Sequence, residues 1–315
     1  MKSFDEIKKL IISNKSRMSL LIGNGFSCGY DERFCSIKER RESESEQTMG
    51  LRYTVTVDNS IGSLRMDDDA VFMFNQIRKC HPKGVCEVND QKAICCGNFI
   101  KSFLSNENSG LVFTTNYDLI LYWAIAKYNN SNTEDPIPYN DGFETRRGNK
   151  WYWEKETSED QNLFFLHGAF NILQQESDKS VYKPMHDQLC YQPIEDRFQK
   201  DLKPVFVSKR IGREKKKQIH CSSYLQFCLE KLRDLSGALV VIGLRLESND
   251  SHIVEVIKQA MESNKLALYY GIYGGDGVFK KGEEKRIRKA FGTNDIVFFD
   301  SGTAPIWAPE PVKGE

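Results

Sequence analysis

The chain has 315 residues, in which 44 Lys and Arg residues balance 44 Asp and Glu residues. A zero net charge provides no overall field that would attract nucleic acid or an anionic membrane, and the longest apolar stretches are too short to span a bilayer. Its nine cysteines are irregularly spaced and odd in number, which favours a reducing compartment over a disulfide scaffold. The first residues lack the apolar core of a signal peptide. We therefore expect a soluble protein of the cytoplasm.

Helical and strand patterns alternate along most of the chain. Apolar residues at helical spacing predict helices, and short apolar runs between turn residues predict strands. In chain order, the predicted elements are a helix at 4–11, a strand at 18–22, helices at 71–77 and 94–103, a strand at 111–115, a helix at 119–127, strands at 163–166 and 204–208, a helix ending at 235, a strand at 238–243, a helix at 251–264, a strand at 266–272, a helix at 283–291 and a strand at 296–299.

This alternation predicts an α/β fold with a doubly wound, mostly parallel, Rossmann-like sheet. We expect a single domain over 1–315, with its core at about 1–127, 163–168 and 201–301. Two polar segments are expected to be insertions, at about 128–162 and 169–200, and residues 170–200 are expected to be irregular. The charged stretch 38–47 is expected to be an exposed helix end or loop, and 48–61 is expected to be weakly extended. The tail after Gly302 is expected to be loose.

Three predicted strands end in small or polar residues. The first is followed by Gly23-Asn24-Gly25-Phe26-Ser27, the second by Thr115-Asn116-Tyr117-Asp118, and the third by His167. The carboxyl ends of parallel strands face one crevice, so these residues can converge on one ligand. A Gly-x-Gly turn lets the backbone approach a phosphate, and a histidine in a crevice can act as a base near neutral pH.

Each of these signals also has an ordinary structural explanation. A Gly-x-Gly turn is a common strand exit, Asn116 and Asp118 can form a capped turn, and a lone histidine is more often structural than catalytic. After the strand at 238–243, Asn249 and Asp250 can contact a ribose or simply cap the next helix. The basic run at 209–217 is more often a solvated helix face than a nucleic-acid site, so direct nucleic-acid binding is not expected.

The order of these blocks resembles the Sir2 (sirtuin-like) NAD-binding superfamily, and more narrowly a bacterial Sir2-like group described as a domain of unknown function, DUF4917. The resemblance implies that Asn116 works near the nicotinamide ribose, Asp118 near the carboxamide, and His167 as the base. It also implies NAD+ as a substrate, held at Gly23, Asn24, Gly25, Phe26, Ser27, Thr115, Gly243, Arg245, Asn249 and Asp250. Arg245 stands where the superfamily has a small polar residue, so it points either to the ribose or a phosphate, or to solvent.

The departures from the superfamily narrow the expected activity. Deacylases of this superfamily carry a zinc module built on two Cys-x-x-Cys pairs, and this sequence has no Cys-x-x-Cys, so no metal is expected. The remaining expectation is an NAD+ glycohydrolase that releases nicotinamide and ADP-ribose. By family analogy it would act in anti-phage defence by NAD depletion, as a homo-oligomer and with a partner ATPase or nuclease.

Two alternatives remain open at this point. The chain could sense NAD or an ADP-ribose derivative without catalysis. It could also be an interaction subunit of a larger defence complex, with its insertions as contact surfaces. The Trp151-Tyr152-Trp153 cluster suits an interface, although it could equally pack the insertion's own core.

Overall fold

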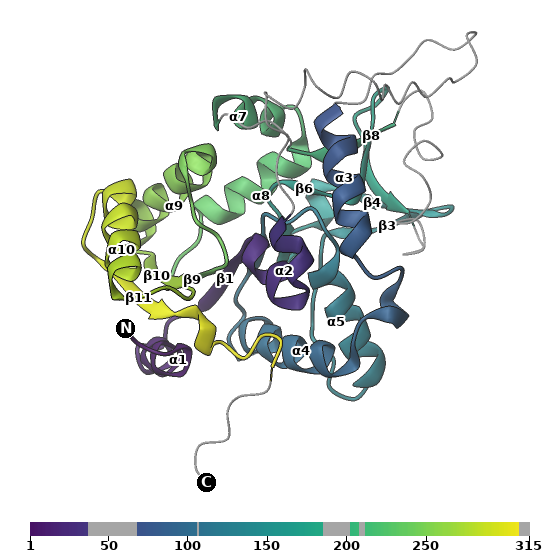
Figure 1. Ribbon diagram of the computed structural model, residues 1–315. Coiled ribbons are helices and arrows are strands. Elements are labelled where there is room, and N and C mark those ends of the chain that lie inside the picture. The colour runs from purple at the N-terminus through teal and green to yellow at the C-terminus, as the bar shows by residue number, and fades with distance from the viewer. Residues whose placement is uncertain (37–67, 106, 185–201, 208–211, 309–315) are drawn as a thin grey trace, which may run out of the picture.

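The computed structural model describes residues 1–36, 68–105, 107–184, 202–207 and 212–308 (Figure 1). Its larger sheet has six parallel strands, which are β1 (Met18–Ile22), β2 (Val112–Thr114), β5 (Leu163–Phe165), β9 (Ala238–Ile242), β10 (Ala267–Ile272) and β11 (Ile296–Asp300). They are arranged in the order β11-β10-β9-β1-β2-β5. The predicted α/β fold with a doubly wound parallel sheet is confirmed.

The central strands owe their position to almost entirely apolar sequence, in which Ser19 is the one polar residue of β1 and β9. All five residues of β1 and of β9 are buried, as expected for strands covered on both faces. Leu20 of β1 lies beside Val112 of β2 on one side and Val240 of β9 on the other. The chain builds the sheet outward from β1 in both directions, so the crevice where ligands bind in such sheets lies at the carboxyl end of β1.

Helices cover both faces of this sheet. They are α1 (Phe4–Ser13), α4 (Asp90–Leu104), α5 (Ile120–Ser131), α8 (Ser223–Arg233), α9 (Ser251–Asn264) and α10 (Gly277–Phe291). In Figure 1, α8 and α9 lie on one side of the sheet and α1 and α4 on the other. Ser3 begins α1 with the capping box expected of a serine followed three residues later by Glu6. Three further helices are α2 (Asn24–Tyr30), α3 (Asp68–Cys80) and α7 (Gly212–His220).

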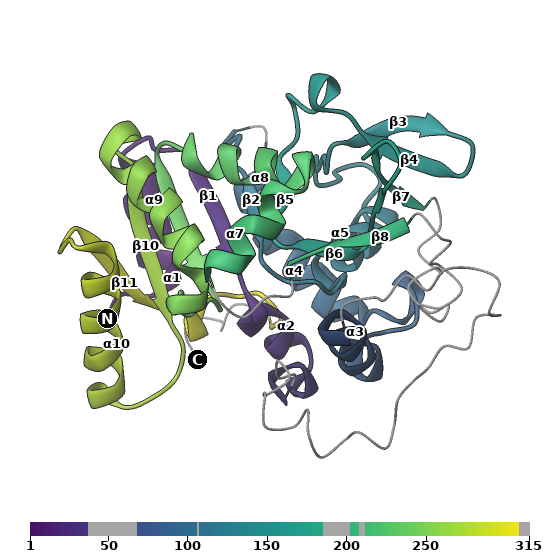
Figure 2. The same cartoon turned by 90° about the horizontal axis from the view of Figure 1, so that it is seen from above.

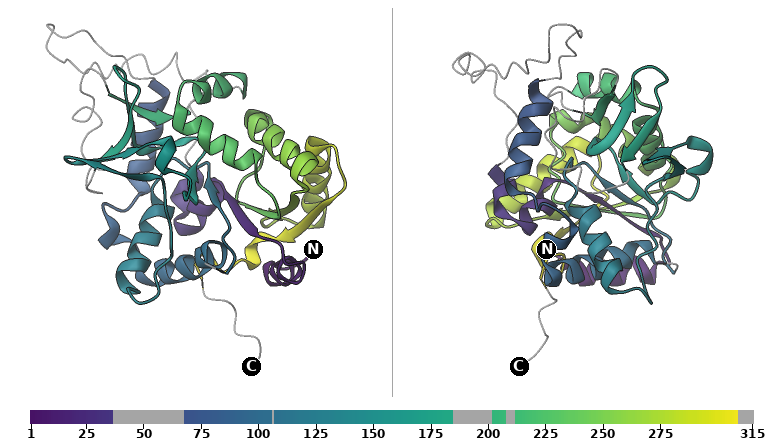
Figure 3. Two further views of the ribbon diagram at one scale, coloured as in Figure 1. Left: turned by 180° about the vertical axis from the view of Figure 1, so that it is seen from behind. Right: turned by 90° about the vertical axis from the view of Figure 1, so that its right-hand side faces the viewer.

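A second sheet lies beyond β5, at one end of the molecule (Figures 2 and 3). Its five antiparallel strands are β3 (Phe143–Arg147), β4 (Lys150–Trp153), β6 (Gly168–Gln175), β7 (Val181–Pro184) and β8 (Leu202–Phe206), in the order β3-β4-β7-β6-β8. The expectation of irregular backbone over 170–200 is therefore wrong at β6 and β7. The strand predicted at 204–208 exists as β8, but it pairs with β6 rather than with the parallel sheet.

Packing against α8 explains why these polar segments form a sheet. Trp153 of β4 is buried against Tyr224 and Phe227, and its indole N–H donates to Gln161 Oε1 at 3.1 Å. Trp153 therefore packs the insertion against α8 of the main fold, so its contacts reach beyond a core of the insertion itself.

The C-terminal segment is docked rather than loose as far as residue 308. Trp307 packs on Phe26 with ring centroids 4.6 Å apart, and its indole N–H donates to the carbonyl oxygen of Phe26 at 2.7 Å. The expectation of a loose tail is wrong for this part. The predictions at 38–47 and 48–61 lie outside the described residues. Among the helices that are described, none has the length and apolar character needed to cross a membrane.

Candidate active site

The glycine-rich turn after β1 meets the end of β9. Gly25 donates its N–H to the carbonyl oxygen of Gly243 at 2.9 Å, and Gly23 donates to that of Ile242 at 3.1 Å. A Cβ on Gly25 would lie 2.6 Å from the Gly243 Cα, and Gly243 itself has a φ of +67°. Two strand ends can approach this closely only without side chains. The contact between the strand ends therefore accounts for the glycines at both positions.

Three polar side chains form a hydrogen-bonded chain at the ends of β1 and β2. Asn116 Nδ2 donates to Ser27 Oγ at 2.9 Å, and Ser27 Oγ donates to Asp118 Oδ2 at 2.7 Å. All three side chains are buried, and Ser27 is 0% exposed. The strand ends thus bring together residues that the sequence placed at separate motifs.

Asp118 lies in a low-dielectric environment beside a histidine. Burial raises the pKa of the Asp118 carboxyl, while His81 and the hydrogen bond from Ser27 oppose the shift. Asp118 Oδ1 also accepts the N–H of Ile120 at 3.0 Å, so the capped-turn explanation of Asp118 is correct as well. Burial of a carboxyl with its hydrogen bonds satisfied is the kind of environment that tunes functional acids.

His81, the residue that follows α3, supports this region and was not identified from the sequence. Its Nε2 accepts the N–H of Leu119 at 3.0 Å, and its Nδ1 lies 2.9 Å from the carbonyl oxygen of Pro82. This pairing assigns the proton to Nδ1 and makes the ring neutral. Burial lowers the pKa of His81, and Asp118 opposes that shift.

His167 follows β5 and contacts a second histidine. Its Nε2 lies 2.9 Å from Nε2 of His252, the second residue of α9, and His167 is only 3% exposed. Burial lowers the pKa of His167 well below its ordinary value, and Lys215 and His252 lower it further. Tyr117 covers the ring, with centroids 6.1 Å apart. His167 is therefore neutral at pH 7 and shielded from solvent.

Asp250 occupies the N-cap position of α9, but its side chain makes no capping hydrogen bond and pairs with a buried lysine instead. Lys215 Nζ lies 3.3 Å from Asp250 Oδ1, and Lys215 is 2% exposed. The expectation that the basic run is a solvated helix face is wrong at this residue. Ile219, one helical turn later, is also buried, and this i, i+4 pairing is the signal that marks the inward face of α7. Asn249 Oδ1 has no hydrogen-bond partner among the described residues.

The remaining predicted binding residues are less closely associated with this site. Asn24 donates to the carbonyl oxygen of Phe34 at 3.3 Å, and Phe26 packs on the C-terminal segment. Thr115 Oγ1 lies 3.4 Å from the carbonyl oxygen of Ile22, at the end of β1. Arg245 is exposed and pairs with Glu247 at 3.0 Å, so its side chain extends toward solvent rather than into the strand-end crevice.

The space beside Asp118 is small. Asp118, Tyr117 and Phe170 line a cavity of about 20 Å³ together with residues of α3. A volume of this size holds about one water molecule rather than a ring. Across the described parts of the chain, no group of three or more His, Cys, Asp or Glu residues is placed to hold a metal ion.

Solved structures of Sir2 proteins are similar to the chain over most of its length. The structure described as "Structural Basis for the Mechanism and Regulation of Sir2 Enzymes" is 14% identical, with 96% of this chain and 95% of that chain covered and a TM-score of 0.40. A Sir2 homolog–NAD complex is 12% identical, with 92% and 96% covered and a TM-score of 0.39. A structure described as "The Structural basis of Sirtuin Substrate Affinity" is 12% identical, with 89% and 91% covered and a TM-score of 0.43.

No curated protein matches the chain. A family model does match, and it covers residues 57–307, which is most of the sequence. The chain therefore belongs to the family described as Domain of unknown function (DUF4917).

Proposed function

We propose that this protein is an NAD+ glycohydrolase that cleaves NAD+ to nicotinamide and ADP-ribose. The observation that carries the proposal is the hydrogen-bonded chain of Ser27, Asn116 and Asp118 at the carboxyl ends of β1 and β2. His167 follows the adjacent strand β5. These four side chains are among those to which the Sir2 resemblance assigns roles, and their position after three adjacent parallel strands supports the proposal.

The reaction breaks the bond between the ribose C1′ and the nicotinamide nitrogen. The cationic pyridinium ring leaves as neutral nicotinamide, water adds to C1′, and one proton is released. The transition state resembles an oxocarbenium ion, as in glycoside hydrolysis. In this proposal Asn116 orients the water and the ribose, Asp118 contacts the carboxamide, and Ser27 holds both side chains in place.

The protonation state of His167 is compatible with the role of a base. A general base must be unprotonated before the reaction, and the lowered pKa of His167 leaves its ring neutral at pH 7. Since its Nε2 is engaged by His252 and Tyr117 covers the ring, catalysis requires these side chains to move when substrate enters. The 20 Å³ cavity beside Asp118 must also enlarge when substrate enters, because it is too small for nicotinamide.

The proposal is tested by measuring nicotinamide release from NAD+ by the purified protein. The variants are Asn116→Ala and His167→Ala, and His220→Ala is the control because His220 is an exposed residue at the end of α7. We expect turnover by the wild type and the control, and its loss in both site variants. General base catalysis contributes about 10²–10⁴-fold, so a loss below 10-fold in His167→Ala would contradict its assignment.

A sensor without catalytic activity is the second candidate, and the shielding of His167 favours it. In that case the wild type would bind NAD+ or ADP-ribose in calorimetry without releasing nicotinamide. His167→Ala would bind as tightly as the wild type. Binding without turnover, under conditions in which the chain is folded, would replace the hydrolase proposal with this one.

We also propose the wider role that the family resemblance implies. The enzyme would deplete NAD+ in anti-phage defence, as a homo-oligomer and with a partner ATPase or nuclease subunit. Light scattering of the purified chain over a range of concentrations would measure its oligomeric state. A monomer at all concentrations would contradict the homo-oligomer part of this role.

A further inference from the structure

A second and much larger cavity lies between the antiparallel sheet and α5. Its volume is about 440 Å³, which is within the range of small-molecule sites. It is distinct from the strand-end site, since the small cavity beside Asp118 shares none of its lining residues. Strands β3, β4, β6 and β7 supply one wall, and α5 with the loop that follows it supplies the other.

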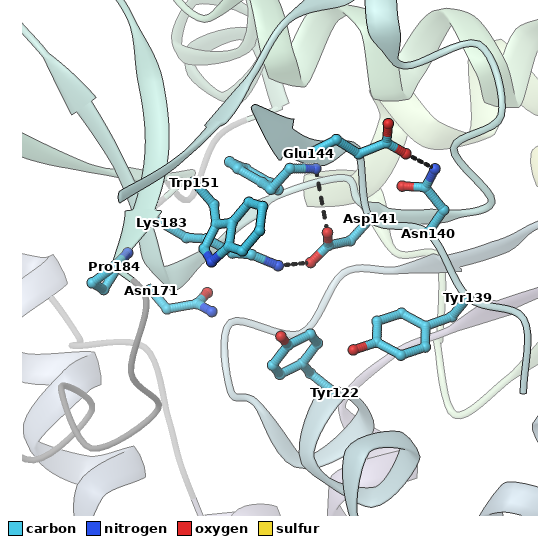
Figure 4. Close-up of a pocket in the computed structure, with 10 residues that line it drawn as sticks. Tyr122, Tyr139, Asn140, Asp141, Glu144, Trp151, Asn171, Lys183 and Pro184 are labelled. Carbon is cyan, nitrogen blue, oxygen red and sulfur yellow. Dashed lines mark hydrogen bonds and ion pairs between the residues drawn. The ribbon is translucent and has the colours of Figure 1, made fainter. Parts of the chain in front are cut away.

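Aromatic side chains form opposite walls of this cavity. Figure 4 shows Trp151 on one side and Tyr122 and Tyr139 on the other. Trp151 lines the cavity and is only partly buried. Exposed aromatic faces in a concave site can stack on a planar ring.

Polar groups in the cavity offer both donors and acceptors. Lys183 forms an ion pair with Asp141, and this carboxylate is its one hydrogen-bond partner among the described residues. An ammonium group has three donor hydrogens, so others remain for a ligand. Asn171 also lines the cavity, and its Oδ1 has no partner among the described residues. A buried amide oxygen without a partner costs free energy, and a ligand donor would recover it once the Asn171 side chain turns this oxygen toward the cavity.

The charges of the lining disfavour an anionic ligand. Asp141 neutralises Lys183, whose ammonium also lies 4.9 Å from the centre of the Tyr122 ring. Glu144 is exposed at the cavity and bonded to Asn140, which leaves one uncompensated negative charge. A phosphate placed here would be repelled, whereas a neutral ring with donors and acceptors on its edge would not.

We propose that this cavity binds the base of a nucleoside, stacked on Trp151, packed against the side chains of Tyr122 and Tyr139, and hydrogen-bonded to Asn171 and Lys183. A nucleobase is planar and carries donors and acceptors side by side on one edge, which matches the two kinds of polar group in the lining. The cavity volume suits a single base with its sugar, and the negative lining places any phosphate outside.

The test is calorimetric titration of the full chain with adenosine, uridine and AMP, in the absence of NAD+. Trp151→Ala removes the stacking surface. Tyr152→Ala is the matched control, because it removes the adjacent aromatic ring of β4. Tyr152 lies across from Tyr182 and packs against it with the rings tilted and their centroids 5.4 Å apart, and it does not line the cavity. Trp151→Phe keeps a ring, and Asn171→Ala removes the unpartnered amide.

We expect the wild type to bind adenosine or uridine. A stacked base is worth about 1–3 kcal/mol, which corresponds to roughly a 5- to 150-fold loss of affinity in Trp151→Ala. Asn171→Ala should also weaken binding, whereas Trp151→Phe and Tyr152→Ala should stay within about 3-fold of the wild type. AMP should bind no more tightly than adenosine.

Several results would overturn the proposal. The first is the absence of binding of either nucleoside to the wild type at millimolar concentration. Another is unchanged adenosine binding in both Trp151→Ala and Asn171→Ala, which would place the nucleoside elsewhere on the chain. AMP binding more than 10-fold tighter than adenosine would contradict the exclusion of phosphate. None of these readouts depends on nicotinamide release, so the site and the proposed hydrolase activity stand or fall separately.

Discussion

Replacing Ser27 with alanine should destabilise the protein through the loss of one atom. The Ser27 hydroxyl accepts a hydrogen from Asn116 Nδ2 at 2.9 Å and donates its own to Asp118 Oδ2 at 2.7 Å. Alanine removes that oxygen without adding bulk, so no steric clash accompanies the change. Its effect is to deprive two buried polar side chains of a shared partner.

The magnitude follows from what those two side chains retain. A buried group left without its partner costs about 1–3 kcal/mol. Asp118 keeps the hydrogen bond from the N–H of Ile120, which limits its share to the lower part of that range. The two contributions together give an expected fall of about 2–4 kcal/mol in the free energy of unfolding. This would be a large fraction of the stability of a typical domain.

Urea denaturation followed by circular dichroism measures this change. Ser13→Ala is the control, because Ser13 donates one hydrogen bond to Leu10 at the exposed end of α1, and its loss should matter by less than about 0.5 kcal/mol. The dependence of unfolding on urea should be the same in all three proteins. A loss in Ser27→Ala as small as that in Ser13→Ala would refute the reasoning that the chain of hydrogen bonds is buried and satisfied internally.

Two further predictions concern the buried histidines and lysine. Burial lowers the folded-state pKa of His252 to about 3 and that of His167 well below 6.5. Both rings protonate in the unfolded chain as pH falls below about 6.5, whereas in the folded protein they stay neutral. The free energy of unfolding should therefore fall by about 2–3 kcal/mol between pH 7.5 and 5.5. Equal urea midpoints at the two pH values would contradict this. Lys215→Met leaves the Asp250 carboxylate buried without its cation and should cost about 3–5 kcal/mol, with partial recovery on adding Asp250→Asn. A thermal melt of the single variant within 2 °C of the wild type would show that the pair contributes little.

The parallel sheet was predictable because its strands are short apolar runs. The central strands do not alternate polar and apolar residues, because both of their faces are covered. Short runs of consecutive apolar residues are therefore expected at the centre of such a sheet. The second sheet was not predictable in the same way. β3 reads Phe-Glu-Thr-Arg-Arg, with only Phe143 buried, and its stability depends on Trp153 packing against a helix some 70 residues later in the chain. Such long-range packing leaves little local signal.

The convergence of Ser27, Asn116 and Asp118 was predictable for a geometrical reason. Parallel strands place all their carboxyl ends at one edge, whatever their distance in sequence. The supporting residues come from helices, where no such rule applies. His252 contacts His167 although the two are 85 positions apart in sequence. Lys215 belongs to a run of charged residues, and such a run predicts a solvent-exposed helix face.

The central position of β1 has a consequence for folding during synthesis. β1 is made early, but its neighbour β9, which places Ala238 beside Met18, follows about 220 residues later. At about 5–20 residues per second, that interval lasts roughly 10–45 s. Until β9 arrives, one edge of an apolar strand has no partner, and such an edge can pair with other chains. Slow translation or a shortage of chaperones should therefore reduce the yield of this protein more than that of a fold whose neighbouring strands are consecutive.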